Sequence, residues 1–407
     1  MYSTCFPPPP DWSTRLRTLG VTGTNGKTST TAFLAAALRT IARPVLRNTT
    51  VGAFLDDEPL DVPATYDGFL EGMRTCLDRG GTFAAIELTS EALALGFAKA
   101  WPCSIGVFTN LTRDHLDAHG SFEHYLASKA QLFVHLPAGG CAVLNGADPA
   151  CPLLEEIIPP GVRVVRYGNA ARMPADRALD LSITSVRTSW EGTSITLATS
   201  SALANLPEHL SLRLIGDLYA ENAAAALAAA VLAGASPEDA ARAISEMPAP
   251  PGRFEVIGKG PRAVVDYAHT PDALSRTLAA ARAVCAGTLT VVFGAGGNRD
   301  QGKRAAMGQA ARGADRIILT SDNPRCEDPA AIAAAIQQGL QGLQGVSVEL
   351  DRAAAIREAL SGASADDVVV IAGKGHEKDQ DVGGVKRPFC DQDVARGVLR
   401  GLGVALS

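Results

Sequence analysis

Residues 21–28 read VTGTNGKT, and an Ala-rich helical stretch follows at residues 28–40. The apolar residues 16–21 predict a strand, so the order is strand, glycine-rich turn, Lys-Thr, helix. In such a segment backbone N–H groups point at phosphate oxygens, Lys27 can reach the β- and γ-phosphates, and the Thr28 hydroxyl can hold Mg²⁺. Val21 stands where the strict P-loop pattern has Gly. A plain strand-to-helix turn would explain Gly23 and Gly26 but not the Lys-Thr pair, so we predict ATP binding.

Length and composition restrict the class of protein. The chain has 407 residues, which suggests two or three domains, and 46% hydrophobic residues are ample for buried cores. The net charge of −6 argues against a nucleic-acid partner. We see no signal peptide and no apolar run of membrane-spanning length, and the eight cysteines form no Cys-x-x-Cys pair. We therefore expect a cytoplasmic protein with reduced thiols and no membrane partner.

Strand and helix patterns alternate along most of the chain and predict an α/β fold. We expect a Pro-rich tail at residues 1–16, a P-loop ATPase domain at 17–247 and a Rossmann-like α/β domain at 252–407. The central sheet of the first domain should be mostly parallel, with a small antiparallel patch at about 178–215. Residues 247–252, MPAPPG, are the clearest linker because consecutive prolines end helices. A single helix is expected at residues 91–100.

Three further residues are candidates for a metal site. Glu87 ends an apolar strand, and strand C-termini line the ligand crevice of an open α/β sheet, so its carboxylate can face a Mg²⁺ held by Thr28. His115 could be a metal ligand or an ordinary polar residue. Lys129 could be a solvated charge, whereas a buried lysine would lose its proton readily and could take up CO₂ as a carbamate.

These segments together resemble a known family. VTGTNGKT, Glu87, residues 108–120 (FTNLTRDHLDAHG) and Lys129 resemble the ATPase domain of the Mur ligases, the ATP-dependent amide-bond ligases of bacterial cell-wall synthesis. Residues 251–256 (PGRFEV), 264–274 (VVDYAHTPDAL), 292–304 (VFGAGGNRDQGKR), 320–325 (TSDNPR) and 368–377 (VVVIAGKGHE) are similar to the MurE branch, which adds the third amino acid of the stem peptide. The resemblance runs from about residue 17 to the end.

The resemblance implies a role for many residues. The ATP ligands would be Gly23, Thr24, Asn25, Gly26, Lys27, Thr28, Asn222, Arg253, Asp266 and His269. Two Mg²⁺ ions would be held by Thr28, Glu87, His115 and a carbamylated Lys129, and catalysis would rest on Lys27, Lys129, His115 and Arg253. The incoming amino acid would be bound by Arg299, Asn323, Arg325, Gly373 and Glu377.

The side chains of the amino-acid set suggest a substrate. Asp-Asn-Pro-Arg at residues 322–325 is the form found in enzymes that accept meso-diaminopimelate. Arg325 can pair with a carboxylate, Asn323 can hydrogen-bond it, and Glu377 can pair with an ammonium group. The reaction expected from the resemblance is amide-bond formation between an acid and an amino acid through an acyl phosphate.

The sequence departs from the MurE branch in ways that leave the acceptor open. Only about twenty residues precede the P-loop, so we expect no N-terminal uridine-binding domain. Thr89-Ser90-Glu91 stands where the branch has Ser-Ser-His. Three hypotheses follow: a MurE-like ligase with another small-molecule acid as acceptor; a true muramoyl-tripeptide synthetase, with the nucleotide sugar bound weakly or through a partner that supplies acceptor binding; or a catalytically idle regulatory homologue. Retention of the ATP and metal residues argues against the third.

Overall fold

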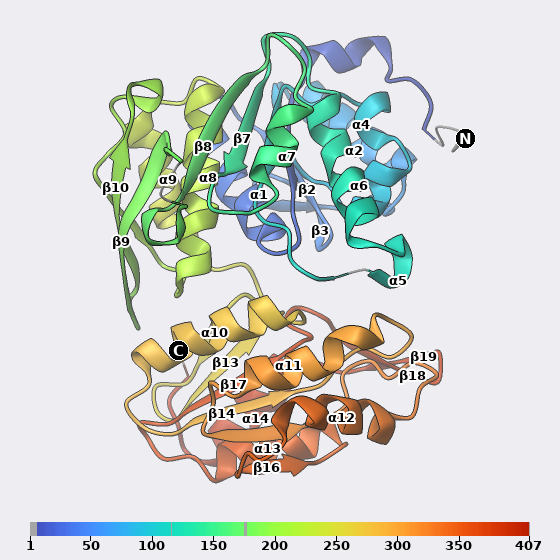
Figure 1. Cartoon of the computed structure of the whole chain (residues 1–407), viewed down its shortest axis with the longest axis vertical. Coiled ribbons are helices and arrows are strands. Elements are labelled where there is room, and N and C mark those ends of the chain that lie inside the picture. The colour runs from blue at the N-terminus through green and yellow to red at the C-terminus, as the bar shows by residue number, and fades with distance from the viewer. Residues whose placement is uncertain (1–5, 115, 175–176, 407) are drawn as a thin grey trace.

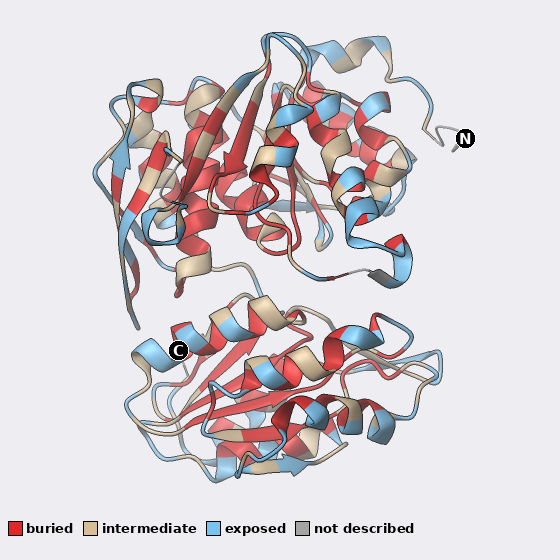
Figure 2. Cartoon of the chain, in the orientation of Figure 1, coloured by how far each residue is buried: buried red, intermediate tan, exposed pale blue. Residues whose placement is uncertain are grey.

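The computed structural model describes residues 6–114, 116–174 and 177–406. It has two lobes, one above the other in Figure 1, joined by the linker at residues 247–252. The N-terminal lobe contains a mixed sheet and the C-terminal lobe a second, smaller one. Buried strands form the centre of each lobe, and the exposed residues gather on the outer helices and loops (Figure 2).

The first sheet has the order β11-β10-β9-β8-β7-β6-β1-β5-β2-β3-β4. Its middle strands, from β9 to β2, are parallel, while β9-β10-β11 and β2-β3-β4 are antiparallel extensions at the two edges. The strands are β1 (Arg17–Thr22), β2 (Val45–Thr49), β3 (Gly52–Leu55), β4 (Glu58–Leu60), β5 (Phe83–Glu87), β6 (Ile105–Phe108), β7 (Cys141–Asn145), β8 (Arg163–Asn169), β9 (Leu181–Ser189), β10 (Gly192–Thr199) and β11 (His209–Leu212).

The helices of this lobe are α1 (Lys27–Leu38), α2 (Tyr66–Asp78), α3 (Ser90–Ala94), α4 (Phe97–Ala100), α5 (Leu116–His119), α6 (Phe122–Val134), α7 (Cys151–Glu156), α8 (Asp217–Leu232) and α9 (Pro237–Glu246). Helices α1 and α8 are buried along almost their whole length. Both are rich in alanine, and small side chains let two packed helices lie close together. Because of these small side chains, α1 can pack inside the lobe. The phosphate loop lies at the start of this buried helix.

The second sheet has the order β12-β13-β17-β14-β15-β16 and is parallel except for β12. Its strands are β12 (Glu255–Ile257), β13 (Arg262–Asp266), β14 (Leu289–Phe293), β15 (Arg316–Leu319), β16 (Val346–Val348) and β17 (Val368–Ala372). A separate hairpin is formed by β18 (Asp379–Val382) and β19 (Val385–Pro388). The helices are α10 (Pro271–Val284), α11 (Arg304–Ala311), α12 (Pro329–Gln337), α13 (Arg352–Ser361) and α14 (Asp391–Gly401).

The predicted fold class is confirmed, with two local differences. The antiparallel patch expected near residues 178–215 joins the first sheet, because β8 pairs with β9 in parallel. The single helix expected at residues 91–100 is two short helices, α3 and α4. Gly96 lies between them with φ of 89°, a left-handed conformation that ends the first helix.

A buried charge cluster holds the two lobes together. Arg276 of α10 contacts Asp217 and Glu221 of α8, at 3.3 and 3.0 Å. Arg172 contacts the same two carboxylates. The side chains of Arg276 and Glu221 are only 10% and 6% exposed. Removing one member would leave a buried charge without its partner, so the cluster favours one arrangement of the lobes.

The seven cysteines in the described part of the chain carry free thiols. Burial raises the pKa of Cys76 to about 11, and that of Cys103 to about 12. Cys326, in contrast, is exposed. Among the described residues, no helix combines the length and the apolar character that crossing a membrane requires.

Candidate active site

The phosphate loop, residues 23–28, connects β1 to α1 and leaves no room for side chains at its glycines. Gly23 has φ of 150°, and a Cβ there would lie 1.9 Å from Thr109 Oγ1. Gly26, at the N-cap of α1, has φ of 85°, and its Cβ would lie 2.3 Å from Asn222 Oδ1. The loop backbone is therefore fixed from behind by Thr109 and Asn222, with its helix N-terminus free to face an anion.

Lys27 folds back over this loop. Its Nζ donates to the carbonyl oxygens of Gly23 and Thr24, at 3.1 and 2.9 Å. Asn25 faces the other lobe, where its Nδ2 donates to Asp272 Oδ2 at 3.0 Å. The loop thus contacts the C-terminal lobe directly.

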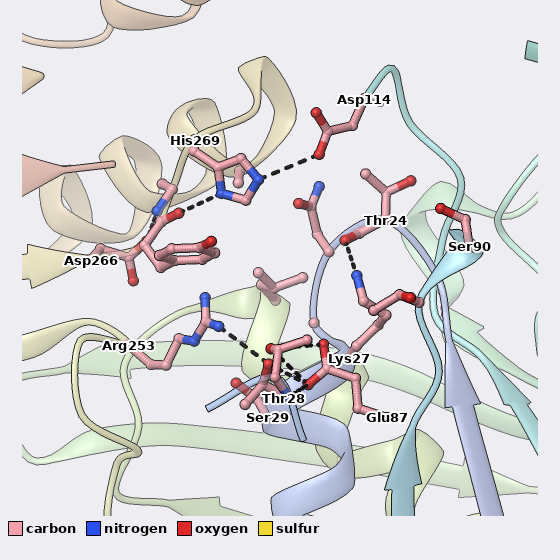
Figure 3. A pocket seen from close by; sticks show the side chains of 18 of the residues that line it. Thr24, Lys27, Thr28, Ser29, Glu87, Ser90, Asp114, Arg253, Asp266 and His269 are labelled. Carbon is pink, nitrogen blue, oxygen red and sulfur yellow. Dashed lines mark hydrogen bonds and ion pairs between the residues drawn. The ribbon is translucent and has the colours of Figure 1, made fainter. Parts of the chain in front are cut away.

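Thr28 lies between a carboxylate and a guanidinium group (Figure 3). Its hydroxyl donates to Glu87 Oε2 at 2.9 Å and accepts from Arg253 Nη2 at 3.2 Å. Thr50, at the end of β2, donates to Glu87 through its backbone N–H. A hydroxyl and a carboxylate oxygen this close together are the donors that Mg²⁺ prefers, so Thr28 and Glu87 fit a magnesium ion.

Lys129 is completely enclosed in the N-terminal lobe. It is 1% exposed, its Nζ donates to Gly23 O at 2.7 Å, and it lies 4.3 Å from the centre of the Tyr125 ring. Burial, helped by the nearby charge of Lys27, holds the pKa of Lys129 well below its usual value. A neutral amine is thereby favoured beside the phosphate loop. The predicted ligand His115 lies outside the described residues.

Asp266 ends β13 on the side of the C-terminal lobe that faces the phosphate loop. Its carboxylate accepts from the backbone N–H groups of Phe254 and Ala268, at 2.7 and 2.9 Å, and from the Thr277 hydroxyl at 3.1 Å. Burial raises its pKa. The bond to Phe254 fixes the backbone next to Arg253. It therefore fixes the direction from which the Arg253 side chain reaches Thr28.

Asp114 was not predicted and connects the two lobes at the centre of the site. Its Oδ1 accepts from Lys303 Nζ at 2.9 Å, and its Oδ2 lies 3.3 Å from His269 Nε2. His269 Nδ1 is 2.9 Å from Tyr267 O. The sequence did contain a signal for Asp114 and for Lys303. Asp114 follows a strand end, and Lys303 lies in the glycine-rich segment 292–304.

A second cavity, of about 190 Å³, lies in the C-terminal lobe. Asn323 Nδ2 donates to Glu377 Oε2 at 2.8 Å, and Lys374 Nζ donates to both side chains, at 3.0 and 2.7 Å. Arg325 has φ of 50° and donates from Nη1 to Gly297 O at 2.6 Å. The cavity thus has a guanidinium group and a carboxylate, which suits an amino acid with charges of both signs.

Two further predicted residues line this cavity. Gly373 has φ of 114°, and a Cβ there would lie 2.5 Å from Asp322 Oδ2. The backbone can therefore lie this close to Asp322 only because residue 373 is glycine. Arg299 lies 3.8 Å from Asp117 Oδ2 of the other lobe. Cys326, which follows Arg325 in the chain, is exposed.

The cavities bring together most of the predicted site. The first, of about 280 Å³, is lined among others by Thr24, Asn25, Gly26, Lys27, Thr28, Glu87, Lys129, Arg253, Asp266 and His269. The second is lined by Arg299, Asn323, Arg325, Gly373 and Glu377. Asp114, Tyr267 and His269 border both cavities. Asn222, expected among the ATP ligands, lies behind Gly26 with 1% exposure.

The fold and the first cavity define a P-loop nucleotide-dependent enzyme that works across two lobes. A family profile described as the Mur ligase middle domain matches residues 21–230, and one described as the Mur ligase, glutamate ligase domain matches residues 252–375. The chain belongs to the Mur ligase family and is an ATP-dependent ligase.

Two curated relatives and two solved structures illustrate the similarity. The UDP-N-acetylmuramoyl-L-alanyl-D-glutamate–2,6-diaminopimelate ligase of Ralstonia nicotianae is 39% identical, over 96% of this chain and 77% of its own. That of Xylella fastidiosa is 40% identical, over 94% and 77%. A solved ligase of the same name has a TM-score of 0.62 at 33% identity, covering 95% and 79%. MurF of Thermotoga maritima in complex with ADP, at 18% identity and a TM-score of 0.70, covering 95% and 81%, supports the fold alone.

The close packing of Gly26 predicts the effect of a single methyl group. Gly26→Ala would place its Cβ against Asn222, so we expect ATP affinity to fall at least about tenfold, measured by calorimetric titration with a non-hydrolysable analogue. Gly139→Ala is the matched control, because Gly139 has a similar φ of 80° with nothing within 4 Å. Both variants should lose about 1–3 kcal/mol of unfolding free energy to backbone strain. Equal ATP affinities in the two variants would contradict the packing argument.

Proposed function

We propose that this protein joins diaminopimelate to UDP-N-acetylmuramoyl-L-alanyl-D-glutamate by an ATP-dependent amide bond. The observation that carries the proposal is the pair of adjoining cavities, one at the phosphate loop and one lined by both Arg325 and Glu377. The names of the relatives favour this acceptor over the unrelated small acid that the short N-terminal segment suggested. The proposed domains are residues 17–247 and 252–407. We place the protein in the cytoplasm, where ATP is available.

The proposed reaction has two steps. The acceptor carboxylate attacks the γ-phosphorus of ATP, and an acyl phosphate and ADP are formed. The amine of the amino acid, after losing a proton, then attacks the carbonyl carbon, and phosphate leaves. Lys27 and Arg253 would neutralise charge on the transferred group, with Arg253 supplied by the C-terminal lobe. Closure of the lobes would keep water from the acyl phosphate.

Magnesium would contribute charge neutralisation at the phosphates, with Thr28 and Glu87 as its protein ligands. We propose that Lys129 reacts with CO₂, forming an N–C bond and releasing a proton, to give a carbamate that supports a second ion together with His115. The low pKa of Lys129 supports this proposal because only the neutral amine attacks CO₂. Asp266 and His269 would lie along the nucleotide on the side of the C-terminal lobe. Asn222 would affect nucleotide binding indirectly, by supporting Gly26 of the phosphate loop.

The overall proposal predicts a specific dependence on substrates. Phosphate release should require both the UDP-linked acceptor and diaminopimelate, and mass spectrometry should find the joined product. Lys27→Ala should lower turnover by about a hundredfold or more, because it removes charge neutralisation from the transition state, while the circular dichroism spectrum stays unchanged. Equal turnover with an unrelated carboxylic acid and none with the UDP-linked acceptor would exclude this acceptor.

The carbamate has its own test. Lys129→Ala should be inactive and should recover part of its activity on addition of short carboxylates, which can occupy the space left by the side chain. The exposed Lys99→Ala is the control and should keep normal activity with or without carboxylate. Full activity of Lys129→Ala would mean that the buried amine plays no part in the reaction.

The choice of amino acid depends on Arg325. A guanidinium group at the distal end of the bound amino acid favours a carboxylate there and repels the ammonium of lysine. One charge-assisted contact is worth about 1.5–3 kcal/mol, so diaminopimelate should be preferred over L-lysine by roughly ten- to a hundredfold in competition assays. Arg325→Ala should lose most of this preference, whereas Arg387→Ala on the exposed strand β19 should not. An unchanged preference in Arg325→Ala would assign the selectivity to other residues.

A further inference from the structure

A third cavity lies on the opposite side of α1 from the phosphate loop. Its volume is about 570 Å³, within the range of small-molecule sites. Its wall includes the C-terminal half of α1, strand β2, helix α9 and residues 247–251 of the linker between the lobes. No residue of this wall belongs to the active site described above.

The charged residues of this cavity are mostly arginines. Arg39, Arg43, Arg47 and Arg242 stand against three carboxylates in the lining. Arg39 pairs with Asp57 at 2.8 Å, Arg43 with Asp56 at 3.2 Å, and Arg242 with Asp239. These three arginines therefore already have an acidic partner.

Arg47 of β2 differs from the other three. Its Nε is buried and has no hydrogen-bond partner among the residues that the structure describes. Its guanidinium group packs 4.2 Å from the centre of the Phe54 ring, and burial together with the nearby Arg39 lowers its pKa. Arg47 is half-buried, and a cation that is partly removed from water without a hydrogen-bonded anion is costly, so an anionic ligand would reduce that cost.

The rest of the wall is apolar. Ala32, Ala36 and Ala243 line it together with Met247 and the prolines of the linker. An inorganic anion alone would leave this surface in contact with water, whereas an anion attached to an apolar group would cover it. We propose that this cavity binds a small phosphate ester, with its phosphate at Arg47 and Arg43 and its apolar part against α1, α9 and the linker.

The position of the cavity gives it a connection to the active site. Helix α1 carries Lys27 and Thr28 at its start and Arg39 just beyond its end, about 18 Å away at 1.5 Å per residue. Strand β2 carries Arg47 and is followed by Thr50, which contacts Glu87. The linker lines the cavity and leads directly to Arg253. An occupant would thus contact three segments that also form the ATP cavity, and its binding should be coupled to ATP affinity.

Phenyl phosphate is a suitable probe, compared with inorganic phosphate. The phosphate loop is first saturated with a non-hydrolysable ATP analogue and Mg²⁺, and each probe is then titrated calorimetrically. We expect one site, with phenyl phosphate bound more tightly than inorganic phosphate. Arg47→Gln should weaken it at least about tenfold, because one charge-assisted contact is lost. Arg187→Gln, on the exposed face of β9, should bind as the wild type does.

A second variant keeps the test valid if Arg47→Gln folds poorly. Ala243→Leu fills the cavity from α9 without altering any arginine, and it too should abolish binding of phenyl phosphate. Absence of binding to the wild type, or equal binding by Ala243→Leu and the wild type, would overturn the proposal. The coupling is tested separately: phenyl phosphate should change the affinity for the ATP analogue by the same factor as the analogue changes the affinity for phenyl phosphate, and a factor of one would exclude it.

Discussion

The side chain of Asn25 connects the phosphate loop to the C-terminal lobe, and much of the site depends on this connection. Its Nδ2 donates to Asp272 and its Oδ1 accepts from the Thr270 hydroxyl, at 3.0 and 3.2 Å. Its backbone N–H and carbonyl are both bonded to Asn110. Because one 8% exposed residue has all these partners, the loop that faces the phosphates and the helix α10 that closes over it have fixed relative positions.

Asp114 has a similar effect between the two cavities. Its carboxylate is bonded to Lys303 and lies beside His269, so the wall shared by the two cavities is built from both lobes. The two cavities adjoin at Asp114, Tyr267 and His269, which line both of them. Asn25 and Asp114 thus both join the two lobes beside the cavities, so the lining of each cavity depends on how the lobes are held together.

Local patterns predicted the strand, turn and helix around the phosphate loop and the alternation of strands and helices, because these signals lie within a few neighbouring residues. Contacts between distant segments could not be predicted in this way. Asp114 and Lys303 are 189 positions apart, and Arg276 meets Glu221 only across the lobe interface. Strand β2 also gave no clear pattern, so the half-buried Arg47 was missed. The buried position of Asn222 depends on packing of α8 against the loop, which only the structure contains.

The cysteines have a practical consequence for chemical modification. The thiolate is the reactive form, so burial and a raised pKa make Cys76 and Cys103 slow to react with alkylating reagents. Cys326 is exposed and follows Arg325, whose side chain lines the second cavity. A fluorophore attached there would lie one residue along the chain from this cavity lining, so the native Cys326 thiol is a suitable labelling site.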